Sequence, residues 1–157
     1  MPLNSGIEKH IGNLLSVKRG IIVHGCNAQG AMGAGVARAV RSQYPLAYQV
    51  YREEYEKNGL KVGDITSAVV ARCEGGTPAL IIVNAVTQEN FGTDRVQVDY
   101  SALSLCFDKV AALARQTLLE VHFPLIGCGL AGGAWEEVAP RIESALGTIP
   151  AHLWVFA

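Results

Sequence analysis

"HGCNAQGAMGAGVARAVRSQYP", residues 24–45, joins an apolar strand to a helix through a loop rich in glycine and alanine. Gly30, Gly33 and Gly35 permit positive φ angles and let the backbone approach a ligand closely. The N-terminus of the following helix offers unpaired amides to an anion, and ligands of open α/β sheets bind outside the carboxyl ends of strands. The loop is therefore a candidate phosphate or ribose site, and a tight turn packed against the sheet is the alternative.

Apolar runs alternate with helical patterns along the rest of the chain. Strands are expected at residues 7–11, 20–24, 65–71, 79–85, 120–125 and 152–156. Helices are expected at residues 35–43, 46–57, 100–116 and 135–146, and Pro140 is expected to kink or interrupt the last of them. This order is typical of an α/β fold in which helices cover both faces of a mostly parallel sheet. The length suits one domain over residues 1–157.

A second glycine-rich loop, "LIGCGLAGGAWEEV" at residues 125–138, also follows an apolar strand and leads into a helix. Residues 127–132 fit the pattern G-x-G-x-x-G, but the last strand, "HLWVFA", lacks the carboxylate that holds the ribose in a Rossmann fold. Neither loop ends in the G-K-[ST] of a P-loop. The interpretation that remains is a metal-free site in which backbone amides bind a diphosphate.

Composition and charge exclude several other classes of protein. The net charge of −1 gives no extensive nucleic-acid surface, and no apolar run is long enough to span a membrane. Four cysteines without a C-x-x-C pair, and no signal-peptide pattern, favour a reducing, cytoplasmic setting. The four histidines are scattered in the sequence without cysteine partners, so neither a metal site nor a cofactor is expected. The charged stretch at residues 51–61 is typical of a solvated helix face.

Together the two loops resemble those of the macro domains, a family that binds ADP-ribose. The resemblance rests on "HGCNAQGAMGAGVARAV" and "PLIGCGLAGGAWEEV", and the nearest likeness is to the stand-alone ADP-ribose 1″-phosphate processing type. It implies a three-layer α/β/α sandwich with a mixed, mostly parallel central sheet. The ligand would lie across the carboxyl edge of the sheet.

The resemblance also implies which residues bind the ligand. Asn27 would contact the distal ribose, and Asn13 stands where family members commonly have an aspartate that accepts from adenine. The remaining binding residues implied are Gln29, Gly30, Met32, Gly33, Gly35, Val36, Ile126, Gly127, Cys128, Gly129, Leu130, Ala131, Gly132 and Gly133. Apart from the resemblance, the loop aromatic Phe91 is a candidate to stack on the ligand, with a packing anchor as the alternative.

The catalytic assignment starts from Asn27, His24 and Asp99. A histidine beside the distal ribose can act as an acid or base, whereas a histidine that ends an apolar strand is otherwise a core residue. Asp99 is a candidate acid or base and also a candidate N-cap.

Two departures from related hydrolases bear on the mechanism. Gln88 and Ala131 stand where macro domains that remove ADP-ribose from glutamate have a lysine and an aspartate, which argues against a covalent lysine mechanism.

Arg95 is a candidate contact for a terminal phosphate. Cysteines beside the loops are expected to be small buried hydrophobes and not nucleophiles.

Three functions remain open at this point. The first is a hydrolase that acts on the distal ribose, with ADP-ribose 1″-phosphate phosphatase as the leading choice and ADP-ribosyl hydrolase beside it. The second is a module that only binds ADP-ribose, free or attached to a macromolecule. The third is a protein that binds another nucleotide or a nucleic-acid end.

Overall fold

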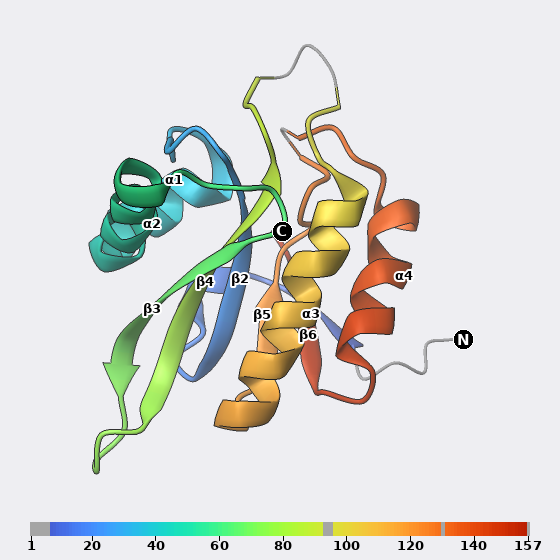
Figure 1. Ribbon diagram of the computed structural model, residues 1–157. Helices are drawn as coiled ribbons and strands as arrows, with labels where there is room; N and C mark the ends of the chain where they lie inside the picture. The colour runs from blue at the N-terminus through green and yellow to red at the C-terminus, as the bar shows by residue number, and fades with distance from the viewer. Residues whose placement is uncertain (1–6, 93–95, 130, 157) are drawn as a thin grey trace.

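The structure is a computed structural model that describes residues 7–92, 96–129 and 131–156. Six strands form one sheet in the order β1-β6-β5-β2-β4-β3 (Figure 1). The strands are β1 (Ile7–Ile11), β2 (Gly20–Asn27), β3 (Ile65–Arg72), β4 (Pro78–Gln88), β5 (Val121–Phe123) and β6 (Ala151–Val155). Only β3 runs antiparallel to its neighbour, so the sheet is mixed and mostly parallel, as predicted.

Helices cover the sheet on both faces and complete a three-layer α/β/α sandwich (Figure 1). They are α1 (Gly35–Gln43), α2 (Pro45–Asn58), α3 (Tyr100–Thr117) and α4 (Trp135–Leu146), with a 3-10 helix, η1 (Leu14–Ser16), after β1. The larger core lies under α3 and α4, where Ile21, Val83, Phe107 and Phe123 are fully buried. A smaller core around Ile22, Val40 and Ile82 lies under α1 and α2.

Of the two effects expected of Pro140, a kink or an interruption, the structure excludes the interruption. Helix α4 runs without interruption from Trp135 to Leu146 and includes this residue. Pro140 is exposed, so water can hydrogen-bond the carbonyl that would otherwise accept from its missing N–H. The proline therefore does not end the helix.

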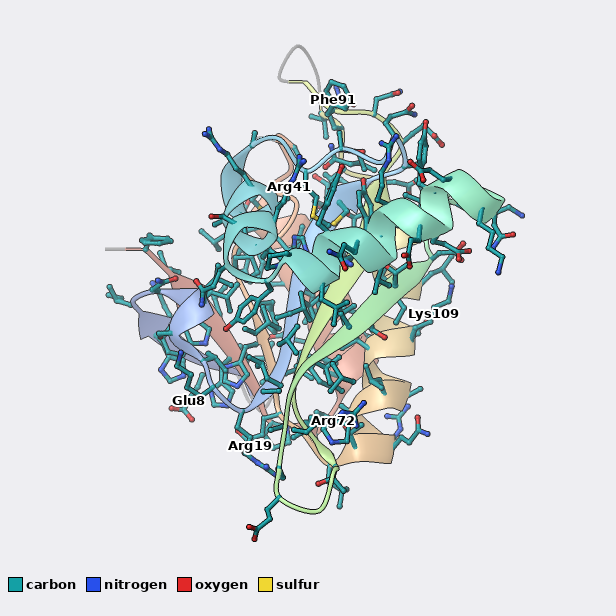
Figure 2. The ribbon with its side chains drawn as sticks, turned by 90° about the vertical axis from the view of Figure 1, so that its left-hand side faces the viewer. Glu8, Arg19, Arg41, Arg72, Phe91 and Lys109 are labelled. Carbon is teal, nitrogen blue, oxygen red and sulfur yellow. The ribbon has the colours of Figure 1, made fainter. Side chains whose placement is uncertain are left out.

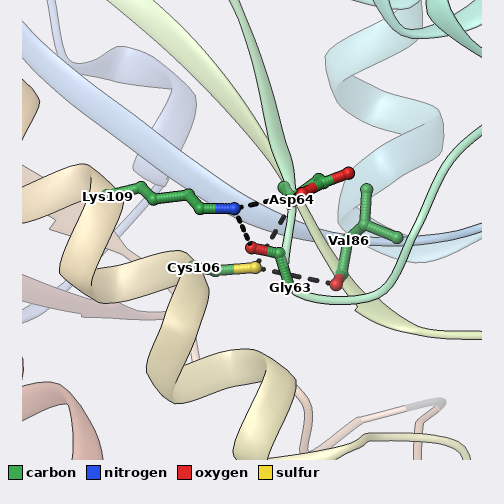
Figure 3. Close-up of polar contacts among 5 residues, drawn as sticks. All are labelled: Gly63, Asp64, Val86, Cys106 and Lys109. Carbon is green, nitrogen blue, oxygen red and sulfur yellow. Dashed lines mark hydrogen bonds and ion pairs between the residues drawn. The ribbon is translucent and has the colours of Figure 1, made fainter.

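Polar contacts tie α3 to the turn before β3 (Figure 3). The ammonium of Lys109 donates to the carbonyl of Gly63 at 2.8 Å and to the carboxylate of Asp64 at 3.1 Å. The buried thiol of Cys106 lies 3.4 Å from the Asp64 carbonyl and 3.6 Å from that of Val86. Burial raises the pKa of Cys106 to about 12, so this thiol stays protonated and serves packing.

None of the helices in the described part of the chain is both long and apolar enough to cross a membrane.

Candidate functional site

The two glycine-rich loops leave the sheet from adjacent parallel strands. Strand β2 pairs with β4 on one side and with β5 on the other. The chain leaves β2 toward α1, on one face, and leaves β5 toward α4, on the opposite face (Figure 1). Such a reversal of direction opens a crevice at the carboxyl ends of the strands, the usual ligand position in α/β sheets.

Asn27 ends β2, and its side-chain amide organises the first loop. Its Nδ2 donates to the carbonyl of Ala31 at 2.9 Å, and its Oδ1 accepts from the amide of Gln29 at 2.9 Å. The hydroxyl of Tyr51, from α2, lies 2.6 Å from the Asn27 carbonyl and 2.9 Å from its Oδ1. A primary amide carries two N–H donors, and the contact to Ala31 uses one of them.

Helix α2 also supports the turn at Gly30. This residue has a φ of 77°, and a Cβ there would lie 2.7 Å from the ring of Tyr55. Arg52 donates to the Gly30 carbonyl at 3.1 Å. Met32 is buried, whereas the neighbouring Gly33 is exposed. The turn is thus packed on one side and open on the other.

The glycines of the second loop also fall into a packed group and an exposed group. A Cβ on Gly133 would lie 2.5 Å from the Gly127 carbonyl, and a Cβ on Gly127 would lie 2.8 Å from Val98. A Cβ on Gly129 would meet nothing within 4 Å, and both Gly129 and Gly132 are exposed. Gly132 has a φ of 75° and donates to the carbonyl of Gly129 at 3.1 Å.

Helices α1 and α4 begin at these loops with alanine at the N-cap, Ala34 and Ala134. Alanine has no side-chain oxygen that can accept from the first-turn amides. By contrast, Asp99 caps α3 by accepting from the amide of Ala102 at 3.0 Å, and Asn13 caps η1 by accepting from Leu15 at 2.9 Å. In α4 the Glu137 amide donates to the Ala134 carbonyl at 3.0 Å. The other first-turn amides of these two helices meet no capping side chain and are left to a ligand or to water.

His24 lies beneath the site and has no exposed surface. Its Nε2 is 2.7 Å from Oδ1 of Asn84, whose own amide donates to Ala47 and Thr66, so Nε2 of His24 carries the proton. Burial lowers the pKa of His24 to about 4. This placement favours the core role that the sequence left open, because a ring with no exposed surface does not reach a ligand on the loops.

Gln29 links the first loop to the segment after β4. Its Nε2 donates to the carbonyl of Glu89 at 3.1 Å and lies 3.3 Å from Oδ1 of Asn90. Gln88, the replacement for lysine, donates to the carbonyl of Asn90 at 2.6 Å. Phe91 is 63% exposed and lies at one extremity of the molecule (Figure 2).

The remaining predicted residues fall into three groups. Val36 lies in the first turn of α1 and is half-buried. Ile126 is buried and Cys128 half-buried in the second loop, where Ala131 accepts from the amide of Gln97 at 2.7 Å. Leu130 and Arg95 lie outside the described residues.

Sequence reasoning missed Tyr51, because the stretch from residue 51 to 61 was interpreted as a solvated helix face. Tyr51 is fully buried, and only the residues around it are exposed or half-buried. The signal was the helical spacing of Tyr44, Ala47, Tyr51 and Tyr55, which marks one face of α2. Its link to Asn27 spans 24 residues and appears only after folding.

The chain matches known proteins over most of its length. The profile described as Macro domain matches residues 23–142. ADP-ribose 1″-phosphate phosphatase of Meyerozyma guilliermondii is 30% identical over 151 aligned positions, covering 80% of this chain and 86% of that protein. DNA ADP-ribosyl glycohydrolase of Thermus aquaticus is 29% identical over 147 positions, covering 92% of this chain and 39% of that protein.

The chain spans about two fifths of the length of the glycohydrolases that it matches. Among solved structures, the macrodomain of Thermus aquaticus DarG superposes with a TM-score of 0.77 at 23% identity, over 96% of this chain and 97% of that one. This likeness establishes the shared fold.

Proposed function

The chain belongs to the macro domain family, and we propose that it binds ADP-ribose and removes a phosphate from the distal ribose of ADP-ribose 1″-phosphate. The match to a phosphatase along 86% of that protein's length supports this choice. The proposed partners are ADP-ribose and its derivatives.

One observation carries the proposal: two helices without capping side chains begin at adjacent glycine-rich loops on one edge of the sheet. Each leaves first-turn amides and the positive end of its dipole at this edge. Two anion sites side by side suit a diphosphate. Gly33 and Gly129 have space where a side chain would stand, which leaves room for the ligand.

Asn27 is the proposed contact to the distal ribose. Three partners hold its amide, so its remaining N–H is fixed before the ligand arrives. Fixed hydrogen bonds raise rates by orienting the reacting bond, and a misplacement of about 1 Å costs about a hundredfold. We assign His24 and Asp99 to structural roles, so hydrolysis would depend on a positioned water molecule and on the amides around the phosphate.

The adenine end is proposed to lie near Asn13. Its Oδ1 already accepts from the Leu15 amide, and a carbonyl oxygen has a second lone pair for the adenine amino group. A neutral amide makes a contact about half as strong as a carboxylate would. Adenine selection should therefore be weaker here than in relatives with aspartate.

The second candidate is removal of ADP-ribose from a macromolecule. The 29% identity to a DNA ADP-ribosyl glycohydrolase favours it. Against it, Gln88 and Ala131 stand where the related glutamate-specific hydrolases have lysine and aspartate, and the Gln88 amide donates to the Asn90 carbonyl. Phosphate release from ADP-ribose 1″-phosphate, compared with release of ADP-ribose from modified DNA, separates the two activities.

The decisive variant is Gly129→Glu, with Gly129→Gln as the matched control. Neither needs a positive φ or displaces a neighbour, so both should fold. For a carboxylate about 6 Å from a diphosphate carrying about two charges, screening by water leaves about 1.4 kcal/mol of repulsion, or a tenfold loss of affinity. Calorimetry with ADP-ribose should show at least this difference between the two variants, and phosphate release should fall in parallel.

Circular dichroism and thermal melting will report whether the variants are folded. Equal affinity of folded Gly129→Glu and Gly129→Gln for ADP-ribose would reject the anion site. Tight binding of ADP-ribose without phosphate release, by the unaltered protein, would leave a binding module.

A further inference from the structure

Three of the four histidines, which the sequence scatters over 143 positions, meet on the part of the sheet formed by β1, β6 and β5. His10 comes from β1, His122 from β5 and His152 from β6. They lie on the face that carries α1 and α2, but these helices pack mainly on β2, β3 and β4. Figure 2 shows Glu8, from the same strand as His10, at the lower left of the molecule, whereas Phe91 lies at the top.

Two imidazole nitrogens and a carboxylate converge in this cluster. Nε2 of His10 is 2.8 Å from Nδ1 of His152. A carboxylate oxygen of Glu8 completes the set, and the three ligand atoms lie within 4.8 Å of one another. Two nitrogens bound to tetrahedral Zn²⁺ at about 2.0–2.1 Å are separated by about 3.3 Å. The rings need to separate by only about half an ångström to admit the ion.

The second nitrogen of His152 is held as in established metal sites. Its Nε2 donates to Oε1 of Glu120 at 2.7 Å, which leaves the lone pair of Nδ1 directed at Nε2 of His10. A metal-bound histidine almost always donates its other N–H to a carboxylate or carbonyl, and this contact fixes the tautomer and raises the basicity of the ligand. On metal binding, His10 would carry its proton on Nδ1, and no net charge change is needed.

Aromatic stacking fixes the planes of both rings. His10 stacks on Trp154 with centroids 4.5 Å apart, and His152 stacks on His122 at the same separation. Trp154 in turn donates from Nε1 to Nδ1 of His122 at 3.0 Å. The rings are therefore held in place before a metal arrives, which reduces the entropy lost on binding.

A hollow of about 320 Å³ opens beside the rings and is lined in part by His10, Glu120, His152 and Trp154. It supplies an entry path and room for the water that would fill a fourth position. Three protein ligands with one open position are also the arrangement of catalytic zinc sites, whereas purely structural sites use four.

We propose that Glu8, His10 and His152 bind a divalent transition-metal ion of the Zn²⁺ class, with Glu120 orienting His152. The ion would link β1, at the edge of the sheet, to β6 and so stabilise this edge. The proposal does not depend on the ADP-ribose site, because the two share no residue.

The test is calorimetry with ZnCl₂ on the full chain after treatment with EDTA. One saturable site per chain is expected. Glu8→Gln should weaken it, His152→Ala should abolish it, and Glu120→Gln should cost about 10- to 100-fold in affinity. Lys9→Ala is the matched control, because Lys9 lies between the ligands on β1 but is exposed on the other face.

X-ray absorption gives an independent readout that does not depend on the variants. Only nitrogen and oxygen neighbours at about 2.0–2.1 Å are expected around the zinc. A sulfur neighbour at about 2.3 Å would place the ion on a cysteine and overturn the assignment. Absence of saturable Zn²⁺ binding, or an affinity that Glu8→Gln and Glu120→Gln leave unchanged in folded protein, would overturn it as well.

Discussion

Acid should destabilise this protein through His24. The ring is fully buried and neutral in the native state, where burial lowers its pKa to about 4, compared with about 6.5 in the unfolded chain. Between these two values the unfolded state binds more protons than the native state. The contribution of His24 to stability is therefore complete above pH 6.5 and is lost as the pH falls from 6.5 to 4.

The magnitude follows from the two pKa values. At pH 5 the unfolded ring is almost fully protonated and the native ring is almost fully neutral, which costs about 2 kcal/mol of unfolding free energy. Below pH 4 the loss approaches about 3.4 kcal/mol, at 1.36 kcal/mol for each unit of pKa. Either loss is a large fraction of the total stability of a small protein.

Urea unfolding at pH 8 and pH 5, on the unaltered protein and on His24→Gln, measures this contribution. The unaltered protein should lose about 2 kcal/mol more than the variant between the two pH values. His122, whose pKa burial also lowers to about 4, is present in both proteins and cancels in the comparison. Equal losses in the two proteins, or an NMR titration of the His24 ring near pH 6.5 in the folded state, would refute the reasoning.

Two further substitutions test the residues around the loops. Tyr51→Phe removes the hydroxyl that holds Asn27 and should lower the free energy of unfolding in urea by about 1–2 kcal/mol. Calorimetry should also show weaker binding of ADP-ribose. Unchanged binding would show that Asn27 needs no such support. Asp99→Ala removes the cap of α3 and should lower stability by about 1 kcal/mol. It should leave the rate of phosphate release within a few-fold at a temperature where the variant is folded, and a larger fall would return Asp99 to catalysis.

Much of the fold was predictable because its signals are local. The apolar runs and helical patterns placed all six strands and four helices, and the bounds of β1, α1 and α4 match the predicted ranges. Strand β2 extends to Asn27, three residues beyond the prediction, because pairing with β4 continues past the apolar run. The direction of β3 was not predicted, since apolar alternation does not say which way a strand runs.

The parts of the site that the sequence could not predict depend on contacts between residues far apart in the chain. The loops could be located because glycine and the change of periodicity mark them in the sequence itself. The support of Asn27 by Tyr51 depends on how α2 packs, and the meeting of His10 with His152 depends on the pairing of β1 with β6. Residues separated by 142 positions leave no local pattern, which is why the histidines appeared unrelated in the sequence.

The structure also separates the two interpretations of the glycine-rich loops. Gly127 and Gly133 are required by packing, because a Cβ on either would collide with a neighbour. That requirement accounts for a tight turn and says nothing about a ligand. Gly33 and Gly129 face open space without a positive φ, so the fold alone would accept a side chain at both. Both lie in loops that lead into helices without capping side chains, so a ligand that fills their space explains them better than the turn does. Gly129→Glu is therefore a sharper test than a substitution at a packed glycine.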